Sequence, residues 1–132
     1  MKRGMERLAV VGALGAVSAA LAASPAFAKG DISIQATPHT VHAGHVVKVR
    51  GQGDDDAEQY TTLVIQERSG KPGHWGRWHA VTRSFDGDAR ASVEATHTGE
   101  LQFRSVLYST DKHHQHAKTD RTSTPVTVHV VR

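Results

Sequence analysis

Short stretches in which apolar and polar residues alternate recur along residues 29–132, and this pattern narrows the possible folds more than any other feature. Successive residues of a β-strand point to opposite faces of a sheet, so each stretch predicts a strand with one apolar face. No window shows the period of an amphipathic helix. We therefore expect an all-β domain. The predicted strands span residues 32–36, 46–51, 61–68, 78–83, 89–96, 101–108 and 126–131.

Clusters of Gly, Asp, Ser and Pro separate these strands at intervals of about 8–12 residues, which is typical of a sandwich of two packed sheets. Asp86-Gly87 is the strongest hairpin signal among them. The predicted fold class is an all-β, seven-stranded antiparallel β-sandwich. The residues expected at its centre, between the two sheets, are Leu63, Ile65, Leu101, Phe103 and Leu107.

The first 28 residues have the three parts of a secretory signal peptide. Basic residues precede an apolar run over residues 8–23, which is shorter than the roughly 20 residues that span a membrane. Small residues at Ala26 and Ala28 predict cleavage between Ala28 and Lys29. We expect a signal-peptide helix at residues 1–28 and one secreted, extracellular domain at residues 29–132, with membrane contact only before cleavage. An uncleaved N-terminal anchor is the alternative.

Composition excludes several other classes of protein. The chain has no cysteine, so its stability comes from packing without disulfides, and no lipid can be attached through a cysteine. Residues 29–132 hold 13 of the Lys and Arg residues and 12 of the acidic ones, and such a balance argues against nucleic-acid binding. The sequence contains no nucleophile elbow, zinc-protease helix or phosphate-binding loop, so we expect no enzyme and no catalytic residue.

The order of short motifs along residues 29–132 resembles the bacterial immunoglobulin-like, or fibronectin-like, β-sandwich modules of secreted and cell-wall proteins. The resemblance implies an immunoglobulin-like sandwich that acts as a non-catalytic binding or structural module. Its partner would be a protein or a cell-wall polysaccharide at the cell envelope or outside the cell. The motifs are Pro38, Val41, Ala43-Gly44, Val47-x-Val49-x-Gly51, Gly73-His74-Trp75, Phe85-Asp86-Gly87, Leu101-x-Phe103-Arg104 and Ser123-Thr124-Pro125-Val126-Thr127-Val128.

Histidine is over-represented, because all ten histidines fall within residues 29–132. Imidazole is a common ligand of zinc and copper, so an extracellular metal-binding protein with Zn or Cu as its cofactor is the alternative function; otherwise we expect no cofactor. Solvated loop residues and a response to pH are two other interpretations of these histidines. The candidate ligands are His39, His42 and His45 in one turn region, and His113, His114 and His116 in the loop before the last strand.

Two further loop features suggest binding. Asp54-Asp55-Asp56 and Asp86-Gly87-Asp88 could offer oxygen ligands to calcium, although acidic loops are usually only solvated. Four aromatic residues would form a stacking platform for sugars if they are exposed, or would cap the core if they are buried: Tyr60, Trp75, Trp78 and Tyr108. Trp75 follows a glycine-rich turn and is the one expected to contact a partner, whereas Trp78 is expected to pack in the core or at its rim.

Overall fold

The computed structural model describes residues 31–132, which form ten β-strands and contain no helix. Accordingly, no helix in this range is long and apolar enough to cross a membrane. The leader helix expected at residues 1–28 and the cleavage position between Ala28 and Lys29 lie outside the described residues. The strands are β1 (Ile32–Thr37), β2 (Thr40–His42), β3 (Val46–Gly53), β4 (Thr61–Lys71), β5 (His74–Trp75), β6 (His79–Ser84), β7 (Asp88–Glu94), β8 (Gly99–Ser109), β9 (Lys118–Thr122) and β10 (Val126–Val131).

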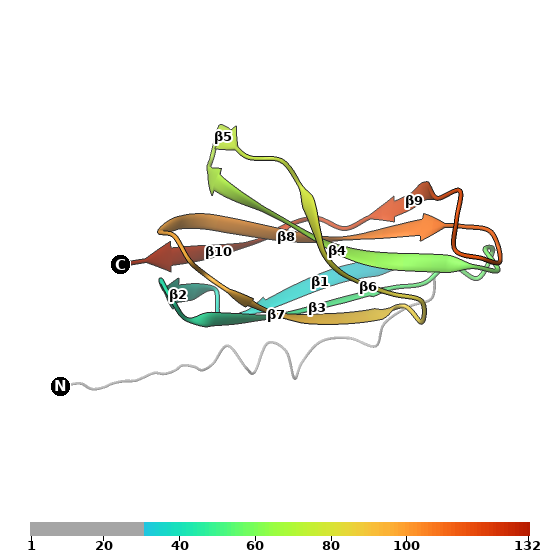
Figure 1. Cartoon of the computed structure of the whole chain (residues 1–132), viewed down its shortest axis with the longest axis horizontal. Helices are drawn as coiled ribbons and strands as arrows, with labels where there is room; N and C mark the ends of the chain where they lie inside the picture. The colour runs from blue at the N-terminus through green and yellow to red at the C-terminus, as the bar shows by residue number, and fades with distance from the viewer. Residues whose placement is uncertain (1–30) are drawn as a thin grey trace.

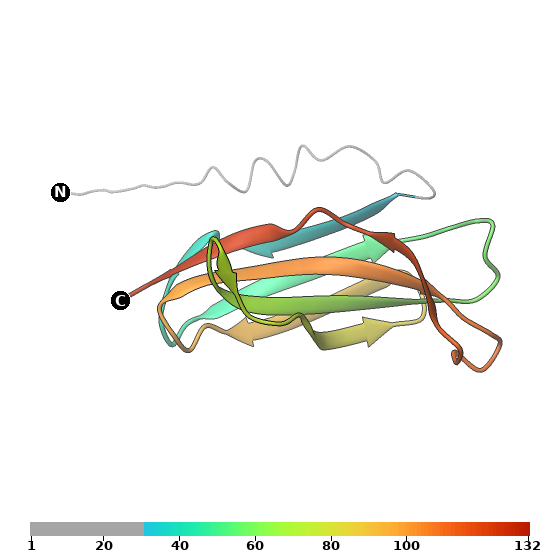
Figure 2. The ribbon, with the colours of Figure 1, turned by 90° about the horizontal axis from the view of Figure 1, so that it is seen from above.

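The strands form two sheets that lie one above the other as in a sandwich (Figure 1). The smaller sheet has the order β1-β3-β7, and both of its strand pairs are antiparallel. The larger sheet has the order β2-β10-β8-β4-β5, and it also contains β6, paired with β4, and β9, paired with β8. Figure 2 shows the long strands β4 and β8 running side by side across the larger sheet.

The core lies between the sheets and consists mainly of the side chains that the alternation predicted, together with Val41 from β2, a strand that the alternation did not predict. All five residues expected at the centre are buried, and Phe103 is the largest of the fully buried side chains. Because every second residue of a strand faces inward, the two sheets contribute to the same core from opposite sides. The buried apolar residues are Ala36, Val41, Val47, Val49, Leu63, Ile65, Ala89, Ala95, Leu101, Phe103, Leu107, Val128 and Val130.

One buried polar side chain links the two sheets within this apolar interior, and its hydrogen bonds are satisfied. Ser105 of β8 is completely buried, and its hydroxyl donates to the carbonyl of Ser33 in the opposite sheet at 2.8 Å. The backbone N–H of Ser105 donates to the hydroxyl of Ser123 at 2.9 Å. A buried hydroxyl without such partners would be costly, so this contact joins the sheets at little penalty.

The seven predicted strands are confirmed as β1, β3, β4, β6, β7, β8 and β10, with small differences at their ends. The prediction of only seven strands, all antiparallel, was wrong. Three short strands were missed, and β2 pairs with β10 in parallel. Their sequences do not show an alternation of apolar and polar residues from which a strand could be predicted. β2 and β5 are only three and two residues long, and β9, Lys-Thr-Asp-Arg-Thr, contains only polar residues.

Candidate binding surfaces

The first histidine group lies on and beside β2 and is only partly brought together. The rings of His42 and His45 meet edge to face, with centroids 6.0 Å apart. Nδ1 of His42 lies 3.0 Å from the backbone oxygen of Arg132, so that nitrogen already has a partner. His39 contacts this region through its backbone: its carbonyl accepts a hydrogen bond from the N–H of His129 at 2.7 Å.

The second histidine group is organised around Asp111. One carboxylate oxygen of Asp111 accepts hydrogen bonds from the backbone N–H groups of His113 and Gln115, both at 2.9 Å. Its other oxygen lies 2.7 Å from Nδ1 of His116. These contacts, of which the hydrogen bond with His116 is the largest, lower the pKa of Asp111 to about 2.

His114 turns to a different set of partners. Its ring stacks on Phe85, with centroids 3.9 Å apart, and Nδ1 lies 3.3 Å from the hydroxyl of Thr62. His114 and His116 both have the left-handed backbone angle φ of 58°. The loop therefore directs these two neighbouring imidazoles to separate partners.

The predicted metal ligands do not converge in the described part of the chain. Within residues 31–132, no group of three or more His, Cys, Asp or Glu side chains is arranged to hold a metal ion. A zinc or copper site needs three or four ligand atoms within about 2.0–2.3 Å of the ion. The metal hypothesis stays a prediction, and a site at either loop would require that loop to rearrange.

Trp75 lies on β5, at the end of a hairpin that rises away from the two sheets (Figure 1). Its partner in the hairpin is Gly70 of β4. Rather than standing free, the indole is partly buried, and the guanidinium carbon of Arg68 lies 4.7 Å from its ring centroid. The residue expected to contact a partner is thus held by a cation–π contact.

Trp78 and Arg104 make further cation–π contacts beside this one, on the outer face of the larger sheet. The guanidinium carbon of Arg68 lies 4.5 Å from the ring centroid of Trp78, and that of Arg104 lies 4.2 Å from the same ring. Each contact shares a member with the next, so Trp75, Arg68, Trp78 and Arg104 form a connected series. We call these four residues the Trp–Arg series. Trp78 is partly buried but does not belong to the core between the sheets.

Side-chain hydrogen bonds hold both arginines of the series in place. Nε of Arg68 donates to Gln102 at 2.9 Å, and Nε of Arg104 donates to Gln66 at 2.7 Å. The strand register explains these pairs, because Arg68 lies directly opposite Gln102 and Gln66 directly opposite Arg104. Fixed in this way, the guanidinium groups lose little further entropy when they meet a partner.

No acidic residue in the described part of the chain neutralises the charges of these two arginines. Among residues 31–132, no carboxylate lies within ion-pairing distance of Arg68 or Arg104. Burial is the main cause of a lowered pKa at Arg104, and repulsion from Arg68 acts in the same direction. The outer face of the larger sheet therefore combines two indole rings with two positive charges.

Sequence reasoning named Trp75 and Trp78 but missed the two arginines that join them in one surface. Gln66, Arg68, Gln102 and Arg104 do occupy the polar positions of two alternating strands, which places them on outer faces. Only the pairing of β4 with β8 shows that they share one face.

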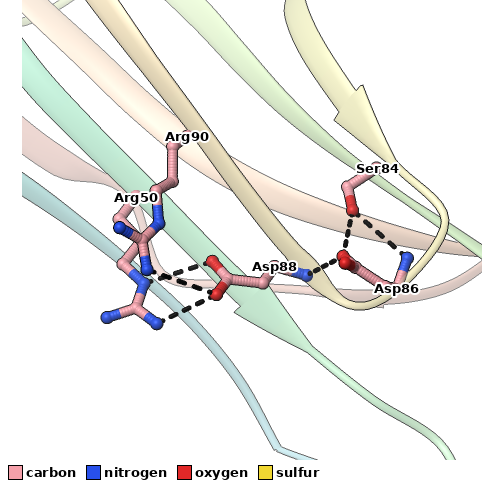
Figure 3. A network of polar contacts seen from close by, with 5 residues as sticks. All are labelled: Arg50, Ser84, Asp86, Asp88 and Arg90. Atoms are coloured by element: carbon pink, nitrogen blue, oxygen red, sulfur yellow. Dashed lines mark hydrogen bonds and ion pairs between the residues drawn. The ribbon is translucent and has the colours of Figure 1, made fainter.

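The carboxylates of the acidic hairpin, which were candidate calcium ligands, already have protein partners. Asp88 accepts a hydrogen bond from Arg50, and Asp86 accepts one from the hydroxyl of Ser84 (Figure 3).

Comparison of the chain with protein-family models finds no match, and comparison with curated proteins finds none either.

Proposed function

We propose that this protein is a secreted, non-catalytic binding module with an immunoglobulin-like sandwich, which engages a cell-wall polysaccharide through the Trp–Arg series. The observation that carries the proposal is the position of two tryptophans and two arginines outside the core, on one face of the larger sheet.

The strand order supports the immunoglobulin-like part of the proposal. Constant-type immunoglobulin domains pair strands A, B and E in one sheet and strands C, F and G in the other. In this protein β1, β3 and β7 are arranged like A, B and E, while β4, β8 and β10 are arranged like C, F and G. The absence of cysteine does not weaken the comparison, because the apolar residues on both inner faces fill the core.

The chemistry of the series supports a polysaccharide as the partner. Aromatic rings that keep a polar edge are favoured where a surface must be both apolar and hydrogen-bonding, and a sugar ring offers the same combination. Gln66, Gln102 and Tyr108 surround the series with amide and hydroxyl groups. Trp75 is an end member of the series with a single arginine contact, so it is the ring best placed to meet a sugar.

Sedimentation with an insoluble bacterial cell-wall polysaccharide preparation tests the proposal. We expect the purified protein to co-sediment, and Trp75→Ala to bind about tenfold more weakly, since such a stacking contact contributes about 1.4 kcal/mol. The matched control is Phe85→Ala, which removes another aromatic ring, 57% exposed and at the opposite end of β6 from Trp78. This control should bind like the wild type.

Thermal denaturation of each variant separates lost binding from lost folding. If the folded Trp75→Ala variant binds as well as the wild-type protein, or if the wild-type protein does not co-sediment, the proposed function is wrong.

A further inference from the structure

A groove of about 460 Å³ lies on the outer face of the smaller sheet. Val49 of β3 and Ala91 of β7 are directly paired and contribute the backbone of its floor, because the residues on either side of them point outward. Its volume falls within the range of about 300–1,000 Å³ that is usual for small-ligand sites. The side chains around it are polar: Gln35, Thr37, Lys48, Arg50, Arg90 and Ser92.

Strand register brings three cations together in this groove. Arg50 lies directly opposite Arg90, and Lys48 lies two residues from Arg50 on the same face of β3. Like charges that are directly opposed on a sheet repel one another, so this arrangement is unfavourable without a counter-charge. A bound anion would therefore relieve the repulsion between these cations and so stabilise the outer face of the smaller sheet.

Asp88 supplies part of that counter-charge. Its carboxylate accepts hydrogen bonds from Nε and Nη2 of Arg50 at 3.1 and 2.9 Å, and Nη2 of Arg90 lies 3.6 Å away (Figure 3). One carboxylate against three cations leaves an excess of two positive charges. The next carboxylate on β7, Glu94, lies opposite Val46 and does not line the groove.

The hairpin before β7 fixes Asp88 in position. The backbone N–H of Asp88 donates to the carboxylate of Asp86 at 3.1 Å, and that carboxylate also accepts a hydrogen bond from the hydroxyl of Ser84 (Figure 3). Gly87 between them has a φ of 82°, which glycine adopts without strain. The turn thus holds Asp88, and Asp88 holds the guanidinium plane of Arg50.

We propose that this groove binds an oxyanion-bearing oligosaccharide, with its carboxylate or phosphate group placed between Lys48, Arg50 and Arg90. Asp88 uses only one edge of the Arg50 guanidinium, and the N–H groups on Nη1 remain for a ligand. Guanidinium groups bind carboxylate and phosphate oxygens in a forked geometry, and the ammonium of Lys48 adds a point charge. Gln35, Thr37 and Ser92 offer hydrogen bonds to the hydroxyl groups of the sugar.

This site is on the opposite sheet from the Trp–Arg series, so the inference goes beyond the proposed function and can fail separately from it. Arg90 is the most suitable residue to remove, because 68% of its side chain is exposed and its loss leaves the bidentate pair of Arg50 and Asp88 in place.

Calorimetric titration of the purified protein at low salt tests the site with three probes. Trigalacturonate carries carboxylates, glucose 6-phosphate carries a phosphate, and maltotriose is neutral. We expect at least one anionic probe to bind and maltotriose not to bind. Arg90→Ala and Lys48→Ala should each weaken anion binding about tenfold or more, which corresponds to the loss of one charge-assisted contact.

The matched control is Arg83→Ala, which removes the same charge from an exposed position on β6 of the other sheet. It should bind the anionic probe as tightly as the wild type. The relative affinity for the two anionic probes identifies which oxyanion the groove prefers. The inference is wrong if neither anion binds, if maltotriose binds equally well, or if Arg83→Ala weakens binding as much as Arg90→Ala does.

Discussion

The hydroxyl group of Ser105 lies within the space that a β-carbon on Gly51 would need, so the two sheets approach closely at this point. We expect Gly51→Ala to lower the free energy of unfolding by about 1–3 kcal/mol, because an added methyl group overpacks the interior. The new carbon would also lie 3.2 Å from Cγ1 of Ile65. Urea denaturation of the variant and the wild type measures the difference.

The variant Ser105→Ala identifies the source of this effect. It removes the hydroxyl that Gly51→Ala would displace, so the double variant should be less destabilised than the sum of the two single variants. Strictly additive free energies would show that Gly51 and Ser105 do not limit the separation of the sheets.

The Trp–Arg series should stabilise the β4–β5 hairpin as well as form a surface. Arg68 contacts both indole rings, so we expect Arg68→Met to lower the free energy of unfolding by about 1–2 kcal/mol. A double-variant cycle with Trp78→Leu should give a coupling of about 0.5–1 kcal/mol. Arg68→Lys is the control, and it should not restore wild-type stability, because an ammonium lacks the planar stacking surface. A coupling of zero would contradict the role of the contact.

Asp111 should titrate far below an ordinary aspartate. Its pKa of about 2, against an ordinary value of 3.8, means that the folded loop binds the proton more weakly than the unfolded chain. The stability that ionised Asp111 contributes is therefore complete above about pH 4 and is lost as the pH falls towards 2. Carbon NMR of the Asp111 carboxyl group should show a midpoint near this pKa of about 2. Asp111→Asn should reduce the pH dependence of stability in this window, and the remainder comes from Asp55, Asp86 and Asp88, whose pKa values are also lowered.

The hydrogen bond with His116 is the largest single contribution to this shift, so His116→Ala should raise the pKa of Asp111. His113→Ala is the matched control, because His113 contacts Asp111 through its backbone and keeps that contact as alanine. A carboxyl midpoint near 3.8 in the wild-type protein would show that the loop does not hold Asp111 in this way.

The leader prediction can be checked by mass spectrometry of protein secreted from a bacterial host. We expect the extracellular protein to begin at Lys29, and Ala28→Tyr to leave the leader attached, because the cleavage site requires a small residue there. Phe27→Ser changes the neighbouring unconstrained position and should be cleaved normally. A wild-type protein that keeps its first 28 residues outside the cell would overturn the assignment.

The positions of the strands and of the core could be predicted from the sequence, because the alternation of apolar and polar residues is a local property. Val47 and Val49 alternate with Lys48 and Arg50, and the structure places the valines inside and the charged residues outside. The same principle identified Leu63 and the other central residues. Where a strand has two or three residues, or only polar ones, no such local signal exists, and β2, β5 and β9 were missed for that reason.

Both candidate surfaces depend on contacts between residues far apart in the chain. Arg68 and Arg104 are recognisable as outward residues, yet their common contact with Trp78 follows from the register of β4 and β8. Arg50 and Arg90 likewise meet only because β3 pairs with β7. Side-chain alternation along one strand determines which way a residue points, whereas the pairing of strands determines what it meets. The sequence by itself therefore determined most of the sandwich interior of this protein, and only the tertiary structure decided which outward-facing residues meet on its two outer faces.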